Sequence, residues 1–172
     1  MIKVKYEGLM QKLKKLEQLK KLMSTPDGKD ILNKLSKKAA DIIYKRVKSG
    51  KGVSSNSQNA VEVSFASMKD FSPAYLRRRK LHPPTGAFSS PAKQNLTYTG
   101  QMLDAIVNEV TRNGFKIFIN KTSREGSKLN NNKVAEYVSE LRPFLALTVK
   151  EQALIKREFI NLVRQLAKKI FS

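Results

Sequence analysis

The sequence predicts an α+β fold in which three main helices pack on a small antiparallel sheet. Amphipathic helical patterns over residues 26–49 and 148–170 supply the first observation, because their apolar positions recur every three to four residues. The second is Asn113-Gly114, which separates two runs of alternating apolar residues and is typical of a tight β-hairpin. Helices near both ends with a small antiparallel sheet between them predict an α+β domain.

The N-terminal part of the chain predicts a strand and then two helices. Residues 2–6 alternate between apolar residues and lysine, and residues 9–23 form an apolar stripe with lysines around it. Thr25 is suited to cap a second helix, with Pro26 at its first position. We expect this second helix to end at residues 49–50, because glycine commonly follows a helix C-terminus.

Residues 50–95 differ in composition from the rest of the chain. Gly and Ser are frequent at 50–57, four of the six prolines lie between 73 and 91, and only 61–65 alternates like a brief strand. The segment is therefore expected to be an extended arm or loop. Loops of this length in a compact domain are usually functional or disordered.

Regular structure is expected again after residue 95. A short helix or turn should follow Thr99-Gly100, and residues 105–111 and 115–119 should pair as the hairpin. Residues 134–140 fit a short helix or a strand, of which we favour the helix. Thr148 and Glu151 form a capping box before the last helix. We expect the 172 residues to fold as a single domain, since this length suits one hydrophobic core.

The chain is strongly basic, with 34 Lys and Arg against 14 Asp and Glu and a net charge of +20. Half of this excess lies in the first 52 residues, which hold 15 basic and 5 acidic side chains. Such a field attracts nucleic acid, anionic membranes or acidic proteins. No apolar run is long enough for a membrane span, and residues 1–5 do not begin a signal peptide, so we expect no membrane partner.

Few residues are suited to catalysis. The chain has no cysteine and one histidine, His82, which excludes thiol chemistry and zinc sites built from Cys or paired His. Two carboxylates, Asp27 and Asp30, flank Lys29 and would suit a metal-dependent nuclease. We favour the simpler interpretation that acidic residues complement the dipole of a helix N-terminus. The sequence thus predicts no enzyme, no cofactor and no metal site.

The densest cationic run is Arg77-Arg78-Arg79-Lys80, which follows Tyr75. Arginine forks pair well with phosphate oxygens, so these four residues are candidates for facing DNA. The alternative is a solvated loop of mutually repelling charges. Aromatic residues do not interleave with the basic ones as they would in a platform that stacks single-stranded bases.

Four segments together resemble a phage family. They are residues 71–75 (Phe-Ser-Pro-Ala-Tyr), Arg79-Lys80, residues 95–106 (Asn-Leu-Thr-Tyr-Thr-Gly-Gln-Met-Leu-Asp-Ala-Ile) and residues 142–147 (Arg-Pro-Phe-Leu-Ala-Leu). In this order they resemble the tail-completion and head–tail joining (neck) proteins of long-tailed DNA phages, along nearly the whole chain. Ala146 departs from the pattern, since glycine is common there.

The resemblance implies a structural virion protein, assembled in the host cytoplasm, at the neck or the head-proximal end of the tail. It implies a homo-oligomeric ring, often sixfold, between the portal or head-completion proteins and the tail tube or terminator proteins, with genomic DNA passing nearby. We expect the arm to make assembly contacts, through Phe71, Tyr75 and Phe88. By contrast, Phe144 and residues 102–106 should mainly anchor the fold. The alternative function is a sequence-nonspecific nucleic-acid-binding protein, which the charge alone supports.

Overall fold

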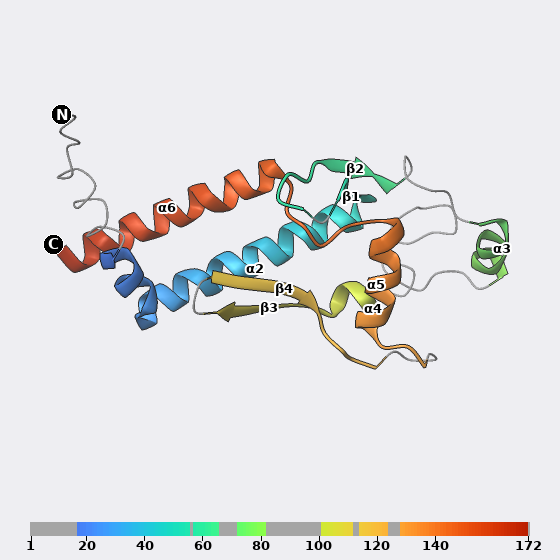
Figure 1. The fold of residues 1–172 in the computed structure, drawn as a ribbon, viewed down its shortest axis with the longest axis horizontal. Coiled ribbons are helices and arrows are strands. Elements are labelled where there is room, and N and C mark those ends of the chain that lie inside the picture. Colours follow the sequence, from blue (N-terminus) through green and yellow to red (C-terminus); the bar gives the residue numbers. More distant parts are fainter. Residues whose placement is uncertain are drawn as a thin grey trace, which may run out of the picture.

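A computed structural model of the chain describes residues 17–55, 57–65, 72–81, 101–111, 114–123 and 128–171. It combines helices with small antiparallel sheets, which confirms the predicted α+β class. Two long helices run antiparallel along the molecule, and a β-hairpin lies along another side of the first of them (Figure 1). The strand predicted at 2–6 and the first part of the helix predicted at 9–23 lie outside the described residues, whereas residues 17–24 are helical.

The central element is α2 (Pro26–Lys48), and its ends follow the predicted signals. The hydroxyl of Thr25 accepts a hydrogen bond from the Gly28 amide at 3.2 Å, and Pro26 opens the helix. At the other end Ser49 is the C-cap and Gly50 has a φ of 84°, a left-handed conformation that favours glycine. Gly28 also allows a close approach, because a Cβ there would lie 2.3 Å from the Leu22 carbonyl oxygen.

The predicted hairpin consists of β3 (Ile106–Thr111) and β4 (Gly114–Ile119), in which Thr111 pairs with Gly114 and Ile106 with Ile119. One face packs toward α2, where the Asn108 amide donates a 2.7 Å hydrogen bond to the Ser36 hydroxyl. The buried Ile119 lies on this face. Val107 and Phe118 pair on the opposite face, where Phe118 is 40% exposed.

The segment 50–95 contains more regular structure than predicted, so its description as a plain arm or loop needs correction. Strands β1 (Lys51–Val53) and β2 (Glu62–Ser64) pair with each other and form a second two-stranded sheet, separate from β3–β4. A helix, α3 (Pro73–Leu81), follows. The strand signal at 61–65 is confirmed by β2, but the single small sheet of the prediction is two sheets.

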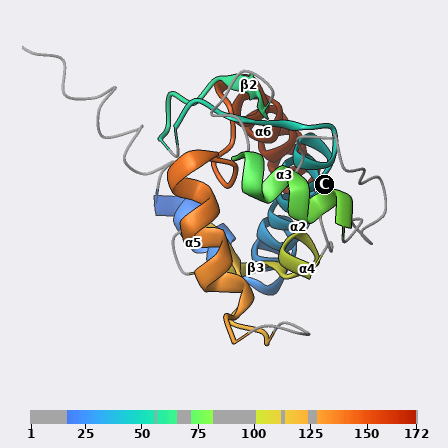
Figure 2. The same ribbon diagram turned by 90° about the vertical axis from the view of Figure 1, so that its right-hand side faces the viewer.

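The rest of the chain supplies a short helix and two longer ones. A single turn, α4 (Gln101–Asp104), precedes the hairpin, and α5 (Asn131–Leu141) confirms the helix favoured for 134–140. Asn130 caps α5 by accepting a 2.9 Å hydrogen bond from the Lys133 amide. The last helix, α6 (Val149–Phe171), runs back along α2. Viewed along the long axis, α6 and α5 lie on different sides of α2 (Figure 2).

Two apolar clusters along α2 hold these elements together. One includes Ile43, Phe65, Met102, Leu103 and Phe144, and the other joins Ile31, Leu35 and Ala39 to Ile155 and Leu166 of α6. Segments far apart in the sequence therefore share one scaffold, which is centred on α2. Among the described helices, none combines the length and apolar character required to cross a membrane.

Candidate functional site

The cationic run 77–80 lies on a helix, α3, rather than in the loop that the sequence predicted. Ser72 caps this helix: its hydroxyl accepts a 3.2 Å hydrogen bond from the Tyr75 amide, and its carbonyl oxygen accepts one from the Leu76 amide at 3.0 Å. Pro73 occupies the first position, where its missing N–H is not needed. The sequence thus specifies a helix start that the proline content of the region concealed.

The described side chains of α3 are exposed to solvent. Arg77, Arg78 and Lys80 are exposed, and the apolar Tyr75 and Leu81 are 38% and 77% exposed. The helix lies at one end of the molecule, beyond the N-terminus of α6 (Figure 1). Of the predicted contact residues, Tyr75 is therefore accessible, and Arg79 belongs to the same helix. Phe71 and Phe88 lie outside the described residues, as does His82.

The two carboxylates considered for a metal do not form a site with a third ligand. Asp27 lies in the first turn of α2, as its dipole interpretation expects, and Asp30 forms an ion pair with Lys34 at 2.7 Å. Within the described part of the chain, no group of three or more His, Cys, Asp or Glu side chains is arranged to hold a metal ion.

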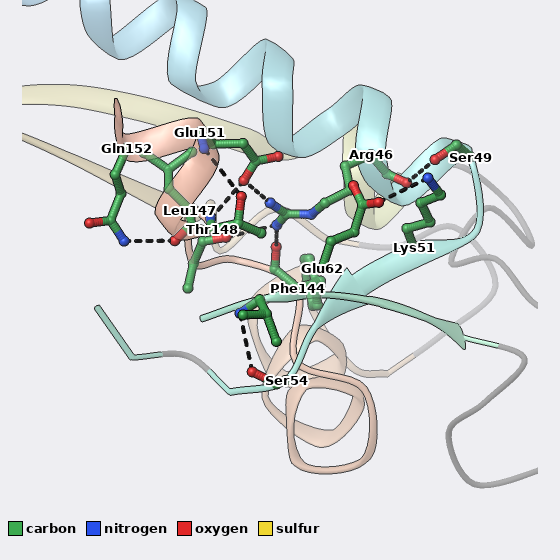
Figure 3. Close-up of polar contacts among 12 residues, drawn as sticks. Arg46, Ser49, Lys51, Ser54, Glu62, Phe144, Leu147, Thr148, Glu151 and Gln152 are labelled. Carbon is green, nitrogen blue, oxygen red and sulfur yellow. Dashed lines mark hydrogen bonds and ion pairs between the residues drawn. The ribbon is translucent and has the colours of Figure 1, made fainter. Parts of the chain in front are cut away.

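Arg46 forms a buried polar centre at the junction of α2, α6 and residues 142–148. Its Nη2 donates hydrogen bonds to the carbonyl oxygens of Phe144 at 2.6 Å and Ala146 at 2.7 Å, and its Nη1 pairs with Glu151 (Figure 3). Glu151 also accepts a 2.7 Å hydrogen bond from the Thr148 amide, which completes the predicted capping box. One carboxylate therefore both caps α6 and neutralises a buried guanidinium.

Burial lowers the pKa of Arg46 from its ordinary value, and the nearby carboxylates of Glu151 and Glu62 partly offset that effect. Glu62 lies on β2 and forms its own ion pair with Lys51 at 2.9 Å. Arginine retains its charge under such conditions, so the centre is a fixed electrostatic joint rather than an acid–base pair. The sequence alone does not predict this centre, although position 46 lies one helical turn from Ile43 on the buried stripe of α2.

The motif residues 142–147 shape this joint. Phe144 is fully buried, which confirms its predicted role as a core anchor. The Pro143 carbonyl oxygen accepts a 2.9 Å hydrogen bond from the Val53 amide, which ties β1 to this segment. The approach is so close that a Cβ on Gly52 would lie 2.5 Å from the same carbonyl oxygen. Met102 and Leu103, from the other resembling segment, pack in the same cluster.

The two acidic side chains of α6 and four of its basic ones lie on different sides of the helix. Its two acidic side chains both point to α2, where Glu151 pairs with Arg46 and Glu158 pairs with Lys38 at 3.1 Å. The basic side chains of Lys150, Arg157, Arg164 and Lys168 are exposed. The run 77–80 is the densest basic segment of the sequence, whereas Arg157, Arg164 and Lys168 are brought together only by the helical periodicity, which places them opposite the apolar face of α6.

Comparison of the chain with protein-family models, with curated proteins and with solved structures finds no match.

Proposed function

We propose that this chain is a structural protein of the head–tail junction of a long-tailed DNA phage and acts as one subunit of a homo-oligomeric ring. The ring would join the portal or head-completion proteins to the tail tube or terminator proteins in the virion. The proposal starts from the four segments that, in their order along the chain, resemble the phage family described above: residues 71–75, 79–80, 95–106 and 142–147. It is supported by one structural observation: residues 101–106 and 142–147 contribute Met102, Leu103 and Phe144 to a single core cluster.

The shared core cluster distinguishes residues that stabilise the fold from residues that are free to contact other subunits. Residues 101–106 and 142–147 are used to build the fold, so assembly contacts fall to outward side chains elsewhere on the subunit. Large apolar residues are exposed on several elements, among them Phe118 on β4, Tyr137 and Leu141 on α5, and Tyr75 on α3. A ring subunit needs two different patches that meet on neighbouring copies, and exposed apolar residues on separate elements are candidates for them.

The direct test is electron microscopy of phage particles labelled with an antibody raised against this chain. We expect label at the head–tail junction. A matched sample of particles from a phage lacking the gene controls for nonspecific labelling, and its heads and tails should remain separate. Label on capsid faces or tail fibres, or no label on mature particles, would contradict the proposal.

The arm can be tested in the same system. Deletion of residues 82–92 should abolish head–tail joining while the purified subunit keeps its helical circular dichroism. An unchanged yield of infectious particles would remove the arm from the assembly contacts, while the location of the protein would still be decided by the antibody.

A second candidate function is sequence-nonspecific binding of nucleic acid, and the exposed Arg77, Arg78 and Lys80 of α3 favour it. The discriminating measurement is duplex affinity at physiological salt. Tight binding that persists there, together with absence of the chain from virions, would favour this function over the first. A neck subunit needs only contacts that weaken steeply as salt rises, because the ring rather than DNA affinity holds it in place.

A further inference from the structure

We propose that the outward surface of α6 is a contact site for the phosphate backbone of double-stranded nucleic acid. This surface, the α6 stripe, consists of Lys150, Arg157, Arg164 and Lys168. The inference assigns duplex binding to a residue set that neither candidate function above specifies. It rests on the charge arrangement of the folded subunit and does not require the ring.

The α6 stripe is straight and regular. At 100° per residue its four cations fall within about 40° of one another, and the first three are spaced by seven residues, or about 10.5 Å. From Lys150 to Lys168 the stripe extends over about 27 Å of helix. The exposed side chains that share this side, Leu154 and Asn161, carry no charge, so no carboxylate interrupts it.

Three of the four cations of the stripe, Lys150, Arg157 and Arg164, take part in none of the described ion pairs. The acids that could have neutralised them are used elsewhere, since Glu151 and Glu158 pair with Arg46 and Lys38 of α2. The two acidic side chains of α6 thus face α2, whereas the four cations of the stripe lie on a different side of the helix.

Helix-dipole effects do not account for the whole stripe. A cation in the last turn, such as Lys168, is favourable there, but Arg157 and Arg164 lie in the interior of the helix. Lys150 lies in the first turn, where a cation is unfavourable and adds to the positive potential of the N-terminus. A partner that carries dense negative charge would offset this arrangement.

The shape and composition of the stripe favour a duplex over other anions. Duplex DNA presents one negative charge per about 1.7 Å of axis, which suits a rigid, evenly charged rod. An anionic membrane would require the apolar face of α6, but that face packs on α2 through Ile155, Phe159 and Leu166. Phe159 is partly buried against the apolar cluster between α2 and α6 rather than presented on the stripe, so it offers no stacking surface there for single-stranded bases.

The α6 stripe and α3 are separate surfaces, because α3 lies beyond the N-terminal end of α6 (Figure 1). They can therefore be tested independently. The stripe variant is Arg157→Gln with Arg164→Gln, which removes two charges and keeps polar side chains. The matched control is Lys29→Gln with Lys37→Gln, two exposed lysines of α2 that take part in none of the described ion pairs. Both variants lower the net charge equally.

The measurement is the affinity of the full-length chain for a labelled mixed-sequence duplex, by fluorescence anisotropy at several salt concentrations. A plot of the logarithm of the association constant against the logarithm of salt concentration has a negative slope. If each arginine neutralises one phosphate, this slope should be shallower by about 1.8 in the stripe variant. Its affinity at 0.1 M salt should fall roughly 10- to 60-fold. The control variant should change the slope far less, and Arg157→Lys with Arg164→Lys should restore it, because the charge is retained.

Several outcomes would overturn the proposal. They are a wild-type slope in the stripe variant, an equal loss in the control variant, and loss only in an Arg77→Gln, Arg78→Gln variant of α3. Tighter binding of the wild-type chain to anionic vesicles or polyglutamate than to duplex would also overturn it. Circular dichroism and thermal unfolding verify that each variant is folded. None of these results bears on antibody labelling of the virion, so failure here and failure of the proposed function are distinguishable.

Discussion

Arg46 and Glu151 form a buried ion pair between the last turn of α2 and the first turn of α6. The Glu151 oxygen that meets the guanidinium also accepts the hydrogen bond from the Thr148 amide. Arg46 in turn satisfies the carbonyl oxygens of Phe144 and Ala146. The pair therefore fixes both the start of α6 and the path of the segment that leads into it.

Replacing Arg46 with alanine should destabilise the chain strongly. The substitution leaves the Glu151 carboxylate and two carbonyl oxygens without their partner in a buried place, so we expect a loss of about 3–5 kcal/mol in the free energy of unfolding. Urea unfolding followed by circular dichroism measures it. The control is Lys45→Ala, which removes an exposed pair with Asp41 and should cost less than about 1 kcal/mol.

Arg46→Lys sharpens the same test. Lysine keeps the charge but lacks the planar fork that reaches three acceptors, so it should recover less than half of the lost stability. Full recovery would show that charge alone matters at this position. A loss below about 1 kcal/mol in Arg46→Ala would contradict the account of the joint altogether.

The sequence was informative where local signals and tertiary packing agree. Thr25 and Thr148 are capping residues at the predicted positions, and the apolar stripes of α2 and α6 are buried as expected. Arg46 was missed because basic residues in the last turn of a helix are normally explained by the dipole. Only the fold shows that residues 142–148 cross over it and supply its acceptors.

Other features could not be derived from local patterns. In α3 the residues 77–80 repel one another and no apolar stripe is formed, so periodicity gives no helix signal, and the Ser72 cap with Pro73 is the only local indication. The division into two sheets depends on β1 pairing with β2, and Gly52 of β1 in turn allows the Pro143 carbonyl oxygen to approach. The sequence of a single strand does not indicate which distant segment it contacts, so such long-range contacts cannot be predicted from local patterns.

Gly52→Ala tests that approach. The added Cβ would lie 2.4 Å from the Phe65 ring and 2.5 Å from the Pro143 carbonyl oxygen, so one of them must move. We expect a loss of roughly 2 kcal/mol or more in thermal unfolding experiments, in the range of overpacked sites. Gly114→Ala is the contrast: its φ of 150° disfavours alanine, but nothing lies within 4 Å of the added atom. A smaller loss in Gly52→Ala than in Gly114→Ala would refute the steric argument.

The first turn of α5 should depend on pH through Lys133 and Glu136, which form an exposed ion pair at 2.7 Å. Their hydrogen bond lowers the pKa of Glu136 and raises the pKa of Lys133. The contribution of Glu136 is present above its unfolded-state pKa and is lost as pH falls through the lowered folded value. That of Lys133 is present below its unfolded-state pKa and is lost as pH rises through the raised value.

The pair should therefore support α5 between about pH 4.3 and 10.4, the ordinary values of the two groups. Carboxyl NMR titration of Glu136 measures the effect directly, and Lys133→Gln should move its midpoint upward toward the ordinary value. Lys128→Gln removes a lysine of the preceding segment for which no pair with Glu136 is found, and it serves as the control. An unmoved midpoint in Lys133→Gln would show that the ion pair is not populated in solution.

If the chain assembles into a ring, the outward face of the β3–β4 hairpin is a candidate contact. Phe118 and Ile119 are neighbours on β4, yet Phe118 is 40% exposed and Ile119 is 3% exposed. Phe118→Asp should leave the free energy of unfolding within about 1 kcal/mol of wild type, because the new carboxylate stays in water. The same substitution at Ile119 buries a charge and should cost more than about 3 kcal/mol.

Sedimentation velocity and negative-stain microscopy then give the informative comparison. We expect Phe118→Asp to remain folded but to shift the chain from rings to monomers, because an interface that buries Phe118 would have to bury an unpaired charge. Ile119→Asp should lose both its folded structure and its rings, so it shows what loss of assembly through unfolding looks like. Rings of normal size in folded Phe118→Asp would exclude this face of the hairpin and direct the search to Tyr137 and Leu141, which are exposed one turn apart on α5.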